Sequence, residues 1–165
     1  MMTNFQQRSV LIVDDEADIR ELLSEHVRAM GFNVLTAEDG VKALEATQQH
    51  EISAIVCDIE MPNMNGLKFL ETVRARDIDI PFIILTGLAD KERVLTALRL
   101  GALDFVSKPF RSDELRSVIQ RAVEIGIRRN RLHSHYANGD LNSVAREKKM
   151  IKLLTLTNHK KRSAS

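Results

Sequence analysis

Short apolar runs recur at intervals along the first three quarters of the chain. They occupy residues 10–13, 34–35, 54–57, 82–85 and 105–106. The clearest of these runs are continuous rather than alternating, which is typical of strands that are buried on both faces of a parallel sheet. The pattern therefore predicts five buried strands.

Segments with helical spacing separate these strands. Apolar residues recur every three or four positions within residues 19–27, 67–73, 94–98 and 115–122, and Val41 with Leu44 gives a weaker signal. Strand and helix alternate five times within about 120 residues, which predicts an α/β three-layer sandwich. Right-handed crossovers between parallel strands favour a doubly wound sheet.

Composition narrows the class of protein. Of the 165 residues, 44% are apolar and 28% are charged, which permits a packed core and argues against global disorder. Aromatic residues make up only 4% and Trp is absent, which argues against an aromatic platform for stacking nucleic-acid bases. The single cysteine, Cys57, excludes a disulfide framework and a Cys-based zinc site. We expect Cys57 to be a small buried apolar residue.

The sequence shows no membrane or export signal. No apolar run approaches the roughly 20 residues that cross a bilayer, and the first ten residues lack the apolar centre of a signal peptide. We expect a cytoplasmic protein without a membrane span.

The net charge of +1 conceals an uneven distribution. Residues 1–127 carry 14 Lys and Arg against 21 Asp and Glu, and residues 128–165 carry 10 against 2. This shift predicts a boundary near Arg128, between an acidic domain of residues 7–127 and a basic extension of residues 128–165.

The extension is expected to be partly helical. The last helix of the domain should run from Asp113 towards Arg131, and the polar residues 133–142, with Gly139, should interrupt it. A short basic amphipathic helix should follow, and residues 159–165 should fray. Its apolar positions are Leu141, Val144, Ile151 and Leu154.

The role of the extension stays open. It is too short for a typical winged-helix or helix-turn-helix output domain, and it holds no zinc-ligand spacing or catalytic set. A solvated tail, a dimerisation helix, a site for an acidic partner and non-specific binding of nucleic-acid phosphates are the alternatives.

Polar side chains follow the predicted strands at their carboxyl ends. Asp14 and Asp15 follow the first strand, Asp58 the third, Thr86 the fourth and Lys108 the fifth. In an open α/β sheet these ends face one crevice. Clustered carboxylates repel one another unless a cation compensates, and oxygen ligands select a hard ion such as Mg²⁺. Each residue alone has a plainer explanation, such as a helix N-cap for the Asp pair, but the joint pattern predicts a site.

Four motifs carry a resemblance to a known family. Val13-Asp14-Asp15-Glu16, residues 58–66, Thr86-Gly87 and Lys108-Pro109-Phe110 closely resemble the response-regulator receiver domain of two-component signalling. The resemblance covers about residues 7–127. It implies a flavodoxin-like sheet of five parallel strands in the order 2-1-3-4-5, with Mg²⁺ as cofactor.

The resemblance also implies roles for the acidic residues. Asp58 is similar to the phosphoacceptor, which takes a phosphoryl group from a sensor histidine kinase or a histidine phosphotransfer protein. Asp15 and Asp58 resemble direct Mg²⁺ ligands, together with the backbone carbonyl of Glu60. Asp14 would act on the ion largely through water.

The remaining implied roles concern the catalytic cation and the switch. Lys108 is similar to the lysine that pairs with a phosphoryl oxygen, and the peptide bond between Lys108 and Pro109 is typically cis in the family. Thr86 resembles a catalytic and switch hydroxyl, and Phe105 resembles the aromatic residue that turns inward with it.

These observations favour a single-domain signalling module over an enzyme with a separate substrate. Its output would be a protein-interaction surface that depends on phosphorylation; the downstream protein is unknown, a homodimer is an option, and nucleic-acid binding is not expected. The alternatives are a Mg²⁺-dependent phosphatase or hydrolase with an aspartyl nucleophile, a DNA- or RNA-binding regulator that uses the basic tail, and a degenerate receiver that serves as a scaffold. The intact set of Asp14, Asp15, Asp58, Thr86 and Lys108 argues against the scaffold.

Overall fold

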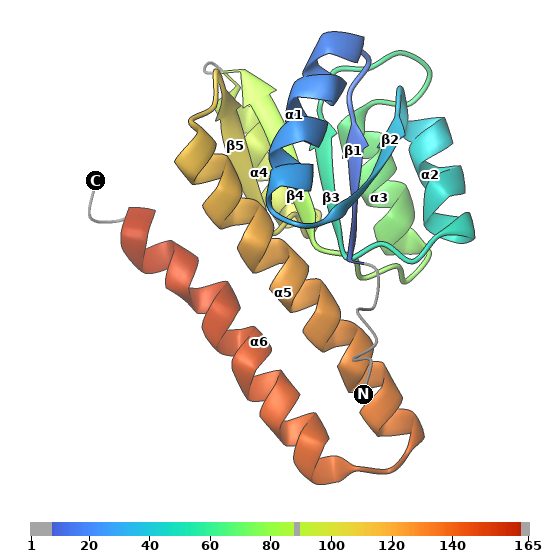
Figure 1. Ribbon diagram of the computed structural model, residues 1–165, viewed down its shortest axis with the longest axis vertical. Helices are drawn as coiled ribbons and strands as arrows, with labels where there is room; N and C mark the ends of the chain where they lie inside the picture. Colours follow the sequence, from blue (N-terminus) through green and yellow to red (C-terminus); the bar gives the residue numbers. More distant parts are fainter. Residues whose placement is uncertain (1–7, 88–89, 163–165) are drawn as a thin grey trace.

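Five parallel strands form the central layer of the structure (Figure 1). This computed structural model describes residues 8–87 and 90–162. The strands pair in the order β2-β1-β3-β4-β5, which confirms the expected doubly wound topology. They are β1 (Ser9–Val13), β2 (Asn33–Ala37), β3 (Ala54–Asp58), β4 (Phe82–Gly87) and β5 (Asp104–Lys108).

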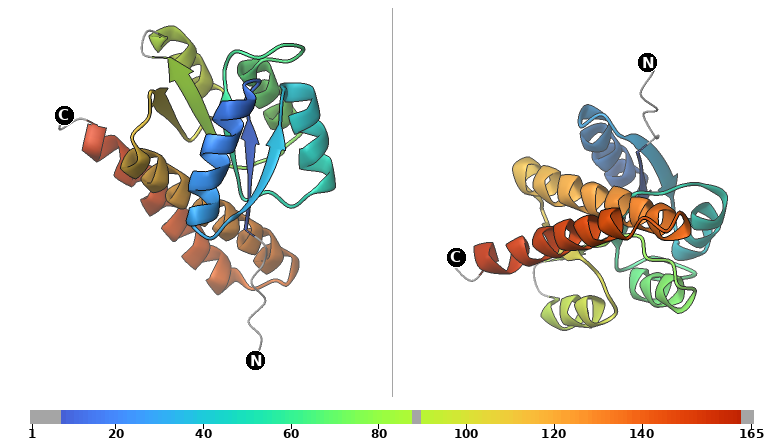
Figure 2. Two further views of the ribbon diagram at one scale, coloured as in Figure 1. Left: turned by 45° about the horizontal axis from the view of Figure 1, so that its top comes forward. Right: turned by 90° about the horizontal axis from the view of Figure 1, so that it is seen from below.

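Helices cover both faces of this sheet. Helices α1 and α5 lie on one face, and α2, α3 and α4 lie on the other (Figures 1 and 2). The helices are α1 (Ala17–Ala29), α2 (Gly40–Gln49), α3 (Gly66–Ala75), α4 (Lys91–Arg99), α5 (Ser112–Ala137) and α6 (Leu141–Arg162).

Strand β1 shows why the apolar runs are continuous. Val10 and Ile12 pack with residues of α1 and α5, whereas Leu11 and Val13 pack with residues of α2, α3 and α4. All four side chains are fully buried. Successive side chains of a strand point to opposite faces, so a strand with helices on both faces needs apolar residues at every position.

The register of the sheet brings its carboxyl ends together. Val13 pairs with Cys57, Asp58 with Leu85, and Gly87 with Lys108. Strand β2 lies beside one edge of β1, and β3 lies beside the other edge. The direction in which successive strands are added to the sheet therefore reverses between β1 and β3. Such a switch point leaves a crevice beyond the strand ends.

The C-terminal part differs from the prediction. Helix α5 continues to Ala137, and only residues 138–140 separate it from α6. The expected break over residues 133–142 is therefore wrong for most of its length. Gly139 does end α5, since it has a φ of +71° and its N–H donates to the Tyr136 carbonyl. The polar residues before it stay helical because α6 packs along α5.

Helix α6 runs back along α5 as the second arm of a hairpin (Figure 2). Val144 is buried, as expected, and Ile151 and Leu154 are half-buried, but Leu141 is 72% exposed and does not belong to the packed face. The helix has 22 residues, so it is not short, and it continues to Arg162 through part of the segment expected to fray. Residues 163–165 lie outside the described part. No helix among the described residues has the length and apolar character needed to cross a membrane.

Buried charges join the two helices of the hairpin. Glu147 on α6 is only 7% exposed, and its carboxylate accepts a hydrogen bond from Arg128 on α5 at 3.0 Å. Arg128 also contacts Glu124, one turn earlier on α5. This charged pair lies within residues 128–165 and joins α6 to the C-terminal part of α5, and the apolar pattern did not predict it.

Candidate functional site

An open cleft of about 620 Å³ lies at the carboxyl ends of the strands. Residues from the ends of β1, β3, β4 and β5 and from the start of α4 line it, as the strand-end pattern predicted. The lining residues are Asp15, Glu16, Asp58, Ile59, Glu60, Thr86, Gly87, Asp90 and Lys108.

Asp14 forms the buried base of the site. Its carboxylate is fully buried, where Oδ1 accepts the Glu16 N–H at 2.9 Å and Oδ2 accepts from Lys108 Nζ at 3.1 Å. Its own N–H donates to the Ala37 carbonyl at the end of β2. Glu16 is the N-cap residue of α1 and makes no side-chain cap. The Asp14 side chain therefore bonds to the turn before α1 and to Lys108.

Asp58 ends β3 and faces the same lysine. Its side chain is 13% exposed, Oδ1 accepts the Ile59 N–H at 2.9 Å, and Oδ2 lies 3.3 Å from Lys108 Nζ. Burial raises the pKa of Asp58, and the charge of Asp14 adds to this against the opposing attraction of Lys108. The Asp58 carboxylate is therefore poorly solvated, and its negative charge is balanced by the ammonium group of Lys108. Such an environment suits a nucleophile.

Lys108 bridges the buried Asp14 carboxylate and the partly buried Asp58 carboxylate. Burial by itself would lower its pKa, but the charge of Asp58 and the hydrogen bond to Asp14 raise the pKa overall. The ammonium group therefore stays charged at the centre of the site. The following peptide bond, to Pro109, is cis, as the resemblance implied, and the residue before a proline has a restricted backbone.

Gly66 sets the position of the loop that follows Asp58. It begins α3, its N–H donates to the Ile59 carbonyl at 2.8 Å, and Asn65 caps the helix by accepting from Lys68 N–H. A Cβ at Gly66 would lie 2.1 Å from the Asp58 carbonyl oxygen. The close approach of α3 to Asp58 therefore requires glycine, a constraint that the sequence alone does not reveal.

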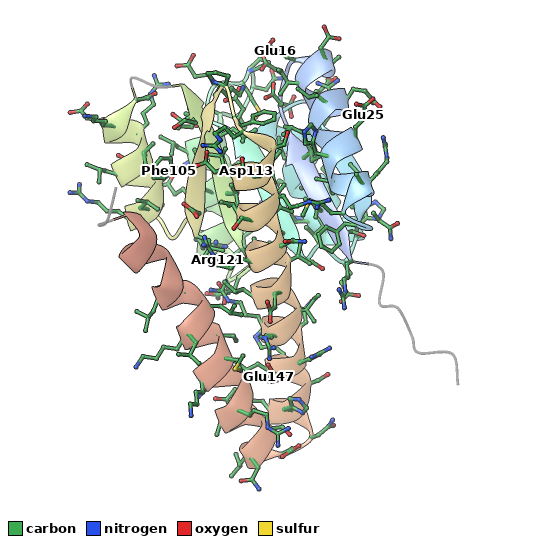
Figure 3. The ribbon with its side chains drawn as sticks, turned by 60° about the vertical axis from the view of Figure 1, so that its left-hand side comes forward. Glu16, Glu25, Phe105, Asp113, Arg121 and Glu147 are labelled. Carbon is green, nitrogen blue, oxygen red and sulfur yellow. The ribbon has the colours of Figure 1, made fainter. Side chains whose placement is uncertain are left out.

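Thr86 and Phe105 lie on neighbouring strands beside the cleft. Thr86 is 3% exposed, and its hydroxyl donates to the Gly87 carbonyl at 3.2 Å. Phe105 is half-buried and packs against the core that β5 shares with α4 (Figure 3). Thr86 therefore lines the cleft, and Phe105 lies on the face of the sheet that α4 covers.

The acidic cluster differs in one member from the expected metal ligands. Ligand atoms of Asp14, Asp15 and Glu16 lie within 4.8 Å of one another. Asp58 lines the cleft with Asp15 and Glu16 but is not part of this tight group. Glu16 was not predicted, because its position after two aspartates does not show whether its side chain turns towards the crevice. These carboxylates offer oxygen donors, which fits a hard cation such as Mg²⁺.

Comparison with known proteins identifies the family. The family model described as the response regulator receiver domain matches residues 10–120. The chain belongs to this family. Receiver domains typically bind Mg²⁺ at an acidic Asp cluster, and this chain has an acidic group of Asp14, Asp15 and Glu16.

Named relatives and solved structures agree with this assignment. The chain is 37% identical over 129 residues to the regulatory protein AtoC of Escherichia coli, covering 78% of this chain and 28% of AtoC. It is 38% identical over 154 residues to the probable transcriptional regulator ycf27 of Cyanidium caldarium, covering 90% of this chain and 61% of that protein.

Solved receiver structures superpose on the same part of the chain. The receiver domain of NtrX from Brucella abortus has a TM-score of 0.67 and 33% identity, and the match covers 70% of this chain and 98% of that one. The chemotaxis response regulator CheY4 of Vibrio cholerae has a TM-score of 0.66 and 32% identity, with 71% and 99% covered. These matches confirm the receiver fold and favour signalling over the aspartyl-nucleophile phosphatase. The chain spans less than two thirds of the length of both curated relatives.

Proposed function

We propose that this receiver accepts a phosphoryl group on Asp58 from the phosphohistidine of a sensor histidine kinase or a histidine phosphotransfer protein. The observation that carries the proposal is the ammonium of Lys108, held between Asp58 and Asp14 at the base of an open cleft. An Asp58 oxygen attacks phosphorus, the P–N bond to histidine breaks, and the imidazole leaves with the electron pair. Lys108 then donates a hydrogen bond to a phosphoryl oxygen.

A magnesium ion fits the acidic side of this cleft. Asp15, Asp58 and the backbone carbonyl of Glu60 are the proposed ligands, and Asp14 acts largely through water. Glu16 joins this proposal because of its place beside Asp14 and Asp15. The ion would neutralise negative charge on the phosphoryl oxygens, which phosphoryl transfer requires.

The proposed signal passes through Thr86 and Phe105 to the face formed by α4 and β5. The Thr86 hydroxyl now donates to a backbone carbonyl, and a phosphoryl oxygen on Asp58 would be a stronger acceptor. Movement of Thr86 would allow Phe105 to turn inward and shift an existing two-state equilibrium. Leu95 and Leu98 on α4 are exposed large apolar residues of this face, which suits contact with a downstream protein or a second copy.

The domain boundary and the extension belong to the same proposal. We assign residues 7–127 to the phosphoacceptor domain and residues 128–165 to an extension without an output domain of its own. Catalysis is confined to the phosphorylation and dephosphorylation of Asp58 itself, in the cytoplasm. Nucleic acid is not an expected partner.

Intact-mass spectrometry after incubation with acetyl phosphate and Mg²⁺ tests this function. We expect a single phosphoryl adduct on the wild-type protein and none on Asp58→Asn. Asp77→Asn is the matched control, because Asp77 lies exposed just after α3 with a φ of 57°, which asparagine also adopts.

Two results would contradict the proposal. One is an adduct that persists in Asp58→Asn, and the other is a wild-type protein that forms no adduct with Mg²⁺ present. Continuous turnover of small phosphate esters would support the phosphatase alternative instead.

A further inference from the structure

The cleft carries an excess of negative charge at its walls. Five of its lining residues are carboxylates, namely Asp15, Glu16, Asp58, Glu60 and Asp90. Among the residues that the structure describes, Lys108 is the one lysine or arginine that lines it, and Asp14 and Asp58 already hold that ammonium group. Every phosphoryl donor is an anion, so the negative charge of these carboxylates opposes its approach to Asp58.

Arg93 does not itself line the cleft, but it supplies a second cation beside it, because it pairs with two residues that do. It extends from the first turn of α4, and its guanidinium forms an ion pair with the Glu60 carboxylate on the loop after β3. Its Nε lies 3.3 Å from Asp90 Oδ2, at the start of α4. One side chain therefore neutralises two of the five cleft carboxylates, which belong to the segments that follow the neighbouring strands β3 and β4.

The protonation state of Arg93 supports this arrangement. An arginine side chain is not deprotonated in proteins, so Arg93 is a permanent cation beside Glu60 and Asp90. It is 43% exposed, and exposed ion pairs contribute little to stability. A charge at the edge of a binding site acts mainly on the rate of association.

We infer that Arg93 is a positioning residue for the entry of the phosphoryl donor. Its ion pairs neutralise the carboxylates of Glu60 and Asp90, which line the cleft. Arg93 thereby increases the rate at which anionic donors reach Asp58. This inference rests on the proposed function. Arg93 takes no proton in the reaction: with acetyl phosphate, an Asp58 oxygen attacks phosphorus, the P–O bond to the acetyl group breaks, and acetate leaves with the electron pair.

The rate of adduct formation with acetyl phosphate, measured at low and high ionic strength with saturating Mg²⁺, tests the inference. We expect Arg93→Ala to slow loading by roughly 3- to 10-fold at low salt, with a smaller difference at high salt because surface charges are then screened. Arg93→Lys should keep most of the rate, because it preserves the charge. Glu60→Gln combined with Arg93→Ala should recover part of it, because one repelling carboxylate is gone.

Arg99→Ala is the matched control, since Arg99 is exposed in the last turn of the same helix and, unlike Arg93, has no ion pair with a cleft residue among the described residues. It should load at the wild-type rate. Two results overturn the inference. The first is equal loading of Arg93→Ala and wild type at low salt. The second is a loading rate that is slow in Arg93→Ala by the same factor at low and high salt, and that is equally slow in Arg93→Lys and in the double variant Glu60→Gln with Arg93→Ala. A wild-type protein that fails to form the Asp58 adduct would instead refute the proposed function.

Discussion

Substitution of Gly66 by alanine is expected to disturb the site through its backbone. The new Cβ would lie 2.1 Å from the carbonyl oxygen of Asp58 and 3.0 Å from its carbonyl carbon, whereas unstrained contacts lie at about 3.5 Å or more. The Asp58 backbone would have to retreat by more than about 1 Å. Forced contacts of this kind cost about 1–3 kcal/mol, and alanine recovers at most about 1 kcal/mol as a better helix former.

These two opposing contributions span a net loss of about 0–3 kcal/mol, and we expect the middle of that range, about 1–2 kcal/mol of unfolding free energy. For a chain of this length that corresponds to a fall in Tm of about 2–8 °C. Loading of Asp58 by acetyl phosphate should slow by at least about tenfold, because a shift of about 1 Å at a reacting group is costly.

Far-UV circular dichroism in a urea titration measures the stability, and intact-mass spectrometry measures the loading rate. Gly87→Ala is the stability control, because a Cβ at Gly87 meets nothing within 4 Å. A Gly66→Ala protein with the stability and loading rate of the wild type would show that α3 does not constrain Asp58, and the reasoning would then be wrong.

Three further predictions concern buried charges. Lys108→Met should lower the unfolding free energy by about 3 kcal/mol, because the buried Asp14 carboxylate loses its cation; added Mg²⁺ should recover part of this in urea titrations, and a variant as stable as the wild type would contradict it. Asp39→Ala removes the cap of α2 and should cost about 1 kcal/mol at pH 7. The pKa of Asp39 is lowered, chiefly by the hydrogen bond that its carboxylate accepts from a backbone N–H of α2. The contribution of Asp39 to the unfolding free energy is therefore present above about pH 4 and is lost as the pH falls through the lowered pKa. A stability difference between Asp39→Ala and the wild type that does not shrink in acid would refute this. Glu147→Ala should cost about 1–2 kcal/mol and speed hydrogen exchange in α6, because Arg128 loses its partner across the hairpin; unchanged protection of α6 would show that the pair does not hold the two helices together.

The strands and the main site residues followed from local pattern. Continuous apolar runs such as residues 10–13 indicate strands with both faces buried, and the structure buries all of these side chains. Asp58 and Lys108 could be placed in one crevice because parallel strands present their carboxyl ends at the same edge. The strand order itself came from the family resemblance, since nothing in the runs tells one strand which neighbour it has.

Other features needed the folded chain. No role for the Glu16 and Arg93 side chains was predicted, because the direction of a side chain relative to a distant carboxylate is not encoded in its neighbours along the sequence. The end of α5 was misplaced because the polar residues before Gly139 have no local apolar signal, although α5 continues through them and α6 packs along it.

The sequence by itself determined that alternating strands and helices bury an apolar sheet and that acids and a lysine stand at the strand ends. Only the tertiary structure decided that Lys108 lies between Asp14 and Asp58, that α3 touches Asp58 at Gly66, and that Arg93 on α4 pairs with Glu60 on the loop after β3. The physical reason is the range of the interactions. Periodicity reflects contacts that repeat along one element, whereas these contacts join residues of different elements and exist only once the sheet and its helices are packed.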